Sequence, residues 1–186
     1  MRLFIAIPLE EEIRRALAEI IFELKQKRGR VKWVTPKNIH LTLKFLGEVS
    51  PDLVAPIGEA ITGVASHHDR FKTVIDRIGA FPNPRRPRVI WAGLTRGSDI
   101  LQSMATEVDQ AMAELGFDKE KRPFKSHLTL GRVKDDSGLN DLGEAVRDYR
   151  MSSLETPLSR VVLFKSTLTP AGPIYDRLVE AELPKS

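Results

Sequence analysis

The sequence predicts an α+β protein built from two similar lobes. Three observations support this. The segment His40–Leu43, with the sequence HLTL, recurs as His127–Leu130, 87 positions later. Other segments match in the same order at nearly the same spacing. Each half also alternates short apolar runs, typical of strands, with longer runs of helical period. Several matches in one order indicate an internal duplication.

The matching segments divide the 186 residues into approximate repeats at 1–87 and 88–186. We expect a single bilobal domain, in which the lobes can exchange terminal strands. The alternative is that the apolar matches record only a shared strand–helix period. Besides the HLTL segments, the matches include Leu3–Ile7 with Ile90–Leu94 at a spacing of 87, Ile57–Ile61 with Leu142–Val146 at 85, and Val74–Ile75 with Val161–Val162 at 87.

Each half is expected to run strand, helix, strand, helix, strand, because alternating or continuous apolar runs are separated by segments of 3.6-residue period. A final extended segment closes the chain at Ile174–Leu183. The expected strands are Leu3–Ile7, Ile39–Leu46, Phe71–Phe81, Val89–Leu94, Phe124–Leu130 and Arg160–Leu168. The expected helices are Ile13–Leu24, Pro51–Val64, Ile100–Leu115 and Leu139–Tyr149.

The composition narrows the chemistry. The chain has no cysteine, which excludes disulfides, thiolate metal sites and a thiol nucleophile. Its net charge of +4 suits an anionic substrate without requiring one. The sequence contains no run of about 18 apolar residues, so no transmembrane helix is expected. The cytoplasm is therefore the expected compartment.

The first HLTL segment places polar side chains on one face of its strand. Side chains alternate along a strand, so His40, Thr42 and Lys44 share one face. Leu41 and its apolar neighbours share the other, which is the expected core face, and alternation assigns Phe45 to it as well. The polar face is then expected to look into a cleft.

The second segment repeats this arrangement with His127 and Thr129. Strict alternation would turn Arg132 toward the core, where a guanidinium is costly. Gly131 permits a bulge that re-aims the next side chain, so we expect Arg132 near the cleft. A pseudo-twofold axis between the halves would bring both polar faces to one groove.

Two facing imidazoles suit hydrolysis of a cyclic phosphodiester. One group takes a proton from water while the other gives a proton to the leaving ribose oxygen. The hydroxyls of Thr42 and Thr129 can donate to phosphate oxygens, and Arg132 or Lys44 can offset negative charge. These residues need no metal or cofactor. The alternative is that these are two unrelated surface histidines, but their places in matching strands argue against it. His67 and His68 have no counterpart in the other half and are expected in solvent.

The segments Trp33–Gly47 and Pro123–Arg132, which contain the two HLTL strings, resemble the paired HxTx motifs of the two-histidine phosphoesterase superfamily. The resemblance is to its bacterial and archaeal RNA 2′,3′-cyclic phosphodiesterase branch, also called 2′-5′ RNA ligase. It implies two antiparallel sheets lining a central cleft, and hydrolysis of a terminal 2′,3′-cyclic phosphate to a 2′-phosphate. It also implies that His40 is the proton donor and His127 the proton acceptor, an assignment that the residues alone leave open.

Several alternatives stay open. The reverse reaction at the same site would be 2′-5′ RNA ligation, and a non-catalytic RNA-end binding module would keep the basic cleft. The expected partners are RNA with 2′,3′-cyclic phosphate ends or small cyclic nucleotides, bound by a monomer. A nucleobase needs a stacking partner, for which Trp33, Phe81 and Phe124 are the candidates, each with a core position as the alternative. The proline- and arginine-rich loop 82–88 is expected to be a stiff surface loop, with an RNA-phosphate contact as the alternative.

Overall fold

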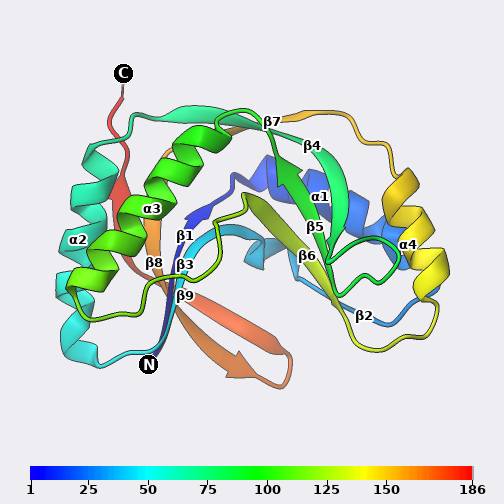
Figure 1. The fold of residues 1–186 in the computed structure, drawn as a ribbon, viewed down its shortest axis with the longest axis horizontal. Helices are drawn as coiled ribbons and strands as arrows, with labels where there is room; N and C mark the ends of the chain where they lie inside the picture. The colour runs from blue at the N-terminus through cyan, green and yellow to red at the C-terminus, as the bar shows by residue number, and fades with distance from the viewer. Residues whose placement is uncertain (186) are drawn as a thin grey trace.

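The computed structural model describes residues 1–185, which form four α-helices and nine β-strands (Figure 1). The helices are α1 (Glu11–Lys25), α2 (Val54–Ser66), α3 (Ser98–Glu114) and α4 (Leu139–Asp148). Two single turns of 3₁₀ helix are η1 (Pro36–Asn38) and η2 (Pro51–Leu53). The strands are β1 (Arg2–Pro8), β2 (Val31–Trp33), β3 (His40–Glu48), β4 (Phe71–Phe81), β5 (Val89–Leu94), β6 (His127–Val133), β7 (Leu154–Leu158), β8 (Arg160–Thr169) and β9 (Gly172–Glu182).

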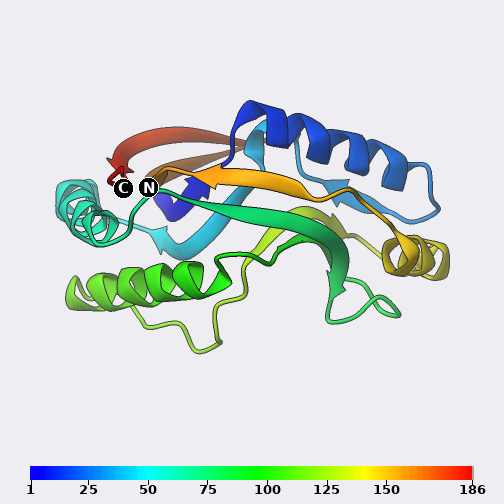
Figure 2. The ribbon, with the colours of Figure 1, turned by 90° about the horizontal axis from the view of Figure 1, so that it is seen from above.

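The strands form two sheets with only antiparallel pairs. One sheet has the order β3-β1-β8-β9, and the other has the order β2-β6-β5-β4-β7. In Figure 2 the strands run through the middle of the molecule, with α1 and α3 on opposite sides. The predicted α+β class with two antiparallel sheets is confirmed.

The halves of the chain are interlaced. Strand β8 belongs to the second half but pairs with β1, and β4 belongs to the first half but pairs with β5. The order β3-β1-β8-β9 therefore corresponds to β6-β5-β4-β7 in the other sheet. The fourth strand of each repeat, β4 in the first and β8 in the second, thus joins the sheet that the other repeat begins.

Two strands were not expected from the sequence. Strand β2 has three residues and β7 has five, including Pro157, and each lies at an edge of the larger sheet. Edge strands tolerate proline and carry little periodic signal because one side of their ladder is unpaired. The strand expected to begin at Phe124 begins at His127 instead, so Phe124 lies in the preceding segment.

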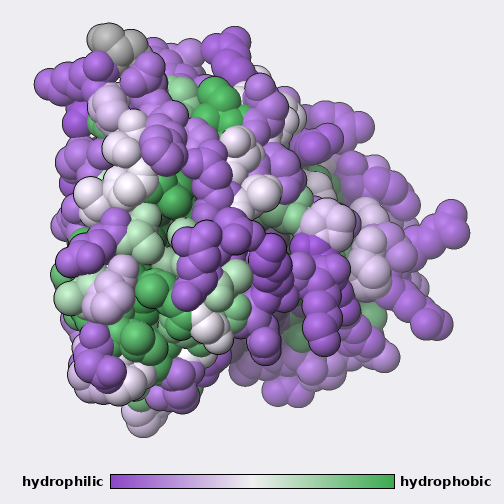
Figure 3. Space-filling view, turned by 60° about the vertical axis from the view of Figure 1, so that its left-hand side comes forward, coloured by the Kyte–Doolittle hydropathy of each residue, from purple (hydrophilic) through white to green (hydrophobic). Residues whose placement is uncertain are grey.

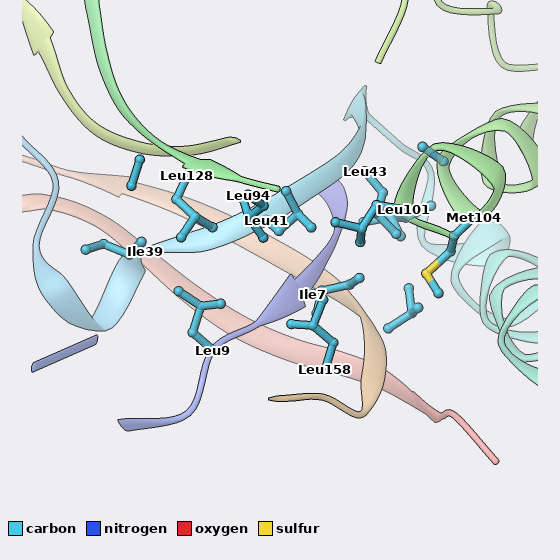
Figure 4. Packing of buried hydrophobic residues seen from close by; sticks show 14 of the residues in the cluster. Ile7, Leu9, Ile39, Leu41, Leu43, Leu94, Leu101, Met104, Leu128 and Leu158 are labelled. Carbon is cyan, nitrogen blue, oxygen red and sulfur yellow. The ribbon is translucent and has the colours of Figure 1, made fainter. Parts of the chain in front are cut away.

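The core takes side chains from both halves. Leu41 and Leu128, which lie within the two HLTL segments, are fully buried in one cluster with leucines from β5 and α3 (Figure 4). Burying a leucine side chain contributes about 2 kcal/mol. The core therefore fixes which face of each motif strand carries its histidine.

Polar side chains dominate the face seen in Figure 3, with apolar residues gathered in a smaller patch. Within residues 1–185, the helices are all too short or too polar to cross a bilayer.

Candidate active site

The two motif strands contain a β-bulge at the same place. In the ladder between β3 and β1 the pairing passes from Lys44 directly to Thr42, so Leu43 has no partner. The same gap in the ladder between β6 and β5 leaves Leu130 without a partner, 87 positions after Leu43. A bulge adds one residue to a strand and reverses the faces of the side chains beyond it.

The bulges also define how the first strands of the halves correspond. Ile5 lies opposite Lys44, and Ile90 lies opposite Gly131. Strands β1 and β5 therefore correspond at a spacing of 85, whereas the sequence match aligned them at 87. An even shift keeps every side chain on the same face of the sheet, so the apolar pattern could not distinguish the two registers.

The bulge in β3 changes the surroundings of the two residues that follow it. Lys44 lines the cavity as expected, but it is 3% exposed, and its ammonium forms an ion pair with Asp109 of α3 and donates to the carbonyl of Asp118 at 2.8 Å. Phe45, expected in the core, is 60% exposed. Both outcomes follow from the extra residue at Leu43, because it reverses the strict alternation of faces along the strand.

The bulge in β6 has the corresponding effect on Arg132, which is exposed and lines the same cavity as the histidines. The irregularity expected at Gly131 lies one residue earlier, at Leu130. Gly131 has a different role, since a side chain there would collide with Val31 and Trp33 of β2.

One cavity of about 880 Å³ brings the motif residues together. Its wall includes side chains from both sheets, from α3 and from the segment before β6. The residues predicted from the sequence that line it are His40, Thr42, Lys44, His127, Thr129 and Arg132. The loop 82–88 does not contribute to this wall. A volume of this size accommodates a nucleotide-sized ligand.

The two histidines are held in the same way. Nδ1 of His40 lies 2.7 Å from the carbonyl oxygen of Asn38, and Nδ1 of His127 lies 2.6 Å from that of Lys125. A carbonyl only accepts, so each Nδ1 carries the proton and donates it. Nε2 is then the nitrogen left for chemistry in both rings.

Burial favours the neutral form of both rings. Desolvation lowers the pKa of His40 to about 4, although its hydrogen bond to Asn38 acts in the opposite direction. Desolvation also lowers the pKa of His127, and the positive charges of Arg132 and Lys125 reinforce that effect. Both imidazoles are therefore neutral at pH 7 unless a bound anion offsets the loss of hydration.

Aromatic rings account for much of this burial. The ring centroid of His40 lies 4.8 Å from that of Phe4 and 5.4 Å from that of Tyr175. His127 meets the ring of Phe81 edge to face at 5.1 Å. Phe81 is thus a packing partner of the histidine, without a place on the cavity wall.

The other stacking candidates separate clearly. Trp33 packs over Gly131 and does not line the cavity, whereas Phe124 is half-buried and does. Phe45 was expected in the core, but it lines the cavity and is well exposed, which makes it a further stacking candidate. The position of Phe45 at the cavity depends on the bulge. The sequence contained one sign of it, because aligning the two repeats places Phe45 at the position of Arg132, which was expected near the cleft.

Neither His67 nor His68 contributes to the wall of this cavity. His67 is exposed as expected, but the side chain of His68 is only 9% exposed and its Nε2 lies 2.8 Å from Glu107 of α3. The expectation of a solvent-exposed His68 is therefore wrong. Residues 1–185 contain no cluster of three or more His, Asp or Glu side chains that could hold a metal ion.

Comparison with known proteins assigns the chain to a family. Residues 7–91 and 95–175 match the family described as LigT like Phosphoesterase. A protein of Archaeoglobus fulgidus named RNA 2′,3′-cyclic phosphodiesterase is 40% identical over 179 residues, which cover 96% of this chain and 98% of the relative. A protein of the same name from Methanocaldococcus jannaschii is 36% identical and covers 97% of this chain and 99% of the relative.

Solved structures agree with this assignment. A crystal structure of a protein from Thermus thermophilus superposes with a TM-score of 0.81 at 30% identity, covering all of both chains. The crystal structure of Escherichia coli LigT complexed with 3′-AMP gives a TM-score of 0.71 at 26% identity, covering 98% of this chain and 97% of that one. The chain belongs to the LigT-like phosphoesterase family, within the two-histidine phosphoesterase superfamily.

Proposed function

We propose that this protein hydrolyses the terminal 2′,3′-cyclic phosphate of RNA to a 2′-phosphate, with His40 and His127 as its acid–base pair. The observation that carries the proposal is the matched geometry of the histidines. Each donates its Nδ1 proton to the carbonyl two residues earlier, and both line one cavity. The relatives named RNA 2′,3′-cyclic phosphodiesterase support the substrate class.

The chemistry needs two proton transfers at one phosphorus. We assign Nε2 of His127 as the base that takes a proton from water while the water oxygen bonds to phosphorus. The bond from phosphorus to the 3′ oxygen breaks, and that oxygen receives a proton from His40. His40 must then be protonated in the substrate complex. The negative phosphate favours this because an adjacent anion raises the pKa of an imidazole.

The remaining polar groups are assigned to the phosphate. Thr42 and Thr129 lie on the same faces as the histidines and line the cavity, so their hydroxyls can donate to non-bridging oxygens. Arg132 supplies the positive charge. Lys44 is a weaker choice than the sequence suggested, because Asp109 already neutralises its ammonium.

Product analysis tests this function. The protein is incubated with an RNA ending in a 2′,3′-cyclic phosphate, in EDTA, with and without a second RNA bearing a 5′-hydroxyl. We expect hydrolysis to a 2′-phosphate in EDTA. A joined RNA would favour ligation, a 3′-phosphate would reverse the leaving-group assignment, and binding without turnover would favour the RNA-end binding module. Loss of activity in EDTA would contradict the metal-free proposal.

The oligomeric state and the cellular compartment are also part of the proposed function. We infer a monomeric enzyme that acts on RNA ends in the cytoplasm, because one chain supplies both histidines and both threonines of the proposed site and the relatives' names specify an RNA substrate. Light scattering of the purified protein checks the monomer, and a dimer would contradict it.

A further inference from the structure

A second, smaller cavity adjoins the catalytic one. It has a volume of about 160 Å³ and shares three lining residues with the larger cavity: Asn38, His40 and Tyr175. Its volume lies well below the roughly 300–1,000 Å³ typical of drug-sized ligands. It therefore suits a small chemical group and is too small for a nucleoside.

Three cationic side chains from distant parts of the chain line this cavity. They are Arg14 of α1, Lys37 of η1 and Arg177 of β9. Among residues 1–185, Arg14 and Lys37 form no ion pair, while Arg177 contacts Glu180 at 3.1 Å. The described lining contains no carboxylate. The catalytic cavity differs, since Asp109 and Glu120 are part of its wall.

This arrangement selects for an anion. Three positive groups converge here, and only Arg177 has an acidic partner, so the cavity has a positive potential. A phosphate oxygen can accept hydrogen bonds from arginine and lysine. Size and charge together therefore point to a single phosphate group. In an RNA strand, the phosphate next to the terminal cyclic phosphate lies one ribose away, on the 5′ side of the last nucleotide.

We propose that Arg14, Lys37 and Arg177 bind the phosphate on the 5′ side of the terminal nucleotide while the cyclic phosphate lies between His40 and His127. The inference rests on the proposed function and extends it to specificity. A site for this second phosphate distinguishes an RNA end from a free cyclic mononucleoside phosphate, which has nothing to place there.

The test compares two substrates that differ by one phosphate. They are a nucleoside 2′,3′-cyclic phosphate with a 5′-hydroxyl and the same compound with a 5′-phosphate. The measured quantity is kcat/KM for the 5′-phosphorylated compound divided by kcat/KM for the 5′-hydroxyl compound. Arg14→Gln combined with Lys37→Gln is expected to lower this ratio about 10-fold, as loss of two partly exposed charge contacts implies. Arg15→Gln is the matched control, because Arg15 neighbours Arg14 but lies outside both cavities.

The outcomes are separable. If the ratio is unchanged in the double variant, or falls equally in Arg15→Gln, the phosphate subsite is wrong while the proposed function stands. If the wild-type protein turns over neither substrate, the proposed function itself fails. Rising salt is also expected to lower the wild-type ratio, because screening weakens charge contacts, and to affect the double variant less. A dinucleotide ending in a cyclic phosphate is expected to behave like the 5′-phosphorylated compound.

Discussion

Phe45 and Arg132 occupy equivalent positions, 87 residues apart, each two residues beyond the bulge in its strand, and both line the catalytic cavity. The duplicated framework therefore presents different chemistry at the same point of its two halves. An aromatic ring faces the cavity from one sheet, and a guanidinium faces it from the other. This asymmetry gives the cavity a direction along which a nucleotide can be oriented.

Replacing Phe45 with alanine is expected to raise KM for base-bearing substrates by roughly 5- to 150-fold. The reason is that stacking of a base on an aromatic side chain contributes about 1–3 kcal/mol. Steady-state kinetics on a 2′,3′-cyclic nucleotide measure the change, with a smaller effect expected on kcat. Phe22→Ala is the control, because Phe22 is also exposed but lies in α1, away from the cavity. Equal KM values for both variants would remove Phe45 as the stacking residue.

His40→Ala and His127→Ala are each expected to lower kcat by at least ~10², the lower part of the range for general acid–base catalysis. The pH–rate profile of the wild type is expected to be bell-shaped, since one ring must be protonated and the other neutral. His67→Ala serves as the control for removal of an imidazole outside the cavity. Full activity in either cavity variant would exclude the paired roles.

Stability is expected to fall at acidic pH because His40 is buried. Its pKa is about 4 in the folded protein and ~6.5 in an unfolded chain. Between these values the unfolded chain binds more protons, so the free energy of unfolding rises with pH. The contribution of His40 is thus fully present above about pH 6.5 and is lost progressively toward pH 4, by up to about 3 kcal/mol.

Denaturant titrations of the wild type and His40→Gln at pH 7 and pH 4.5 measure this effect. The variant is expected to lose less stability between the two pH values, because glutamine does not titrate. The same loss in both proteins would show that His40 is not the group responsible.

The ion pair between Lys44 and Asp109 is expected to be structural. Asp109→Asn leaves the buried ammonium without its counter-charge, so the free energy of unfolding is expected to fall by about 3 kcal/mol. Glu155→Gln is the control, because its partner Lys72 is exposed, and such a surface pair contributes less than about 1 kcal/mol. Chemical denaturation measures both.

A double variant separates charge from packing. Lys44→Met combined with Asp109→Leu is expected to recover most of the stability lost in Asp109→Asn, since no unpaired charge remains. A double variant as unstable as the single one would show that shape, rather than charge, is what this site requires.

The sequence predicted the central part of the site because two constraints coincided there. Alternation fixed His40 and Thr42 opposite the core leucines, and the second copy fixed His127 and Thr129 in the same way. Each of these residues precedes the bulge in its strand. Period-two patterning is reliable up to the first irregularity and says nothing of where that irregularity falls.

Register was the second limit. The sequence match aligned β4 with β8 at a spacing of 87, but the ladders pair Ile5 with Leu163 and Ile90 with Ala80, which gives 83. In the structure Phe81 therefore corresponds to Phe164, and both rings lie near a motif histidine. Shifts of two or four residues preserve the apolar face, so composition alone cannot detect them. The ladder hydrogen bonds decide the register, and they depend on tertiary pairing.

The interlaced strands have a consequence for how the protein is made. Strand β8 lies inside the smaller sheet and β4 lies inside the larger one, so each half of the gene encodes an interior piece of the other half's sheet. A polypeptide emerging from the ribosome cannot complete the smaller sheet until almost all of it has been synthesised. Two separately produced halves would each expose an unpaired strand edge, and they would have to find one another before either could become stable.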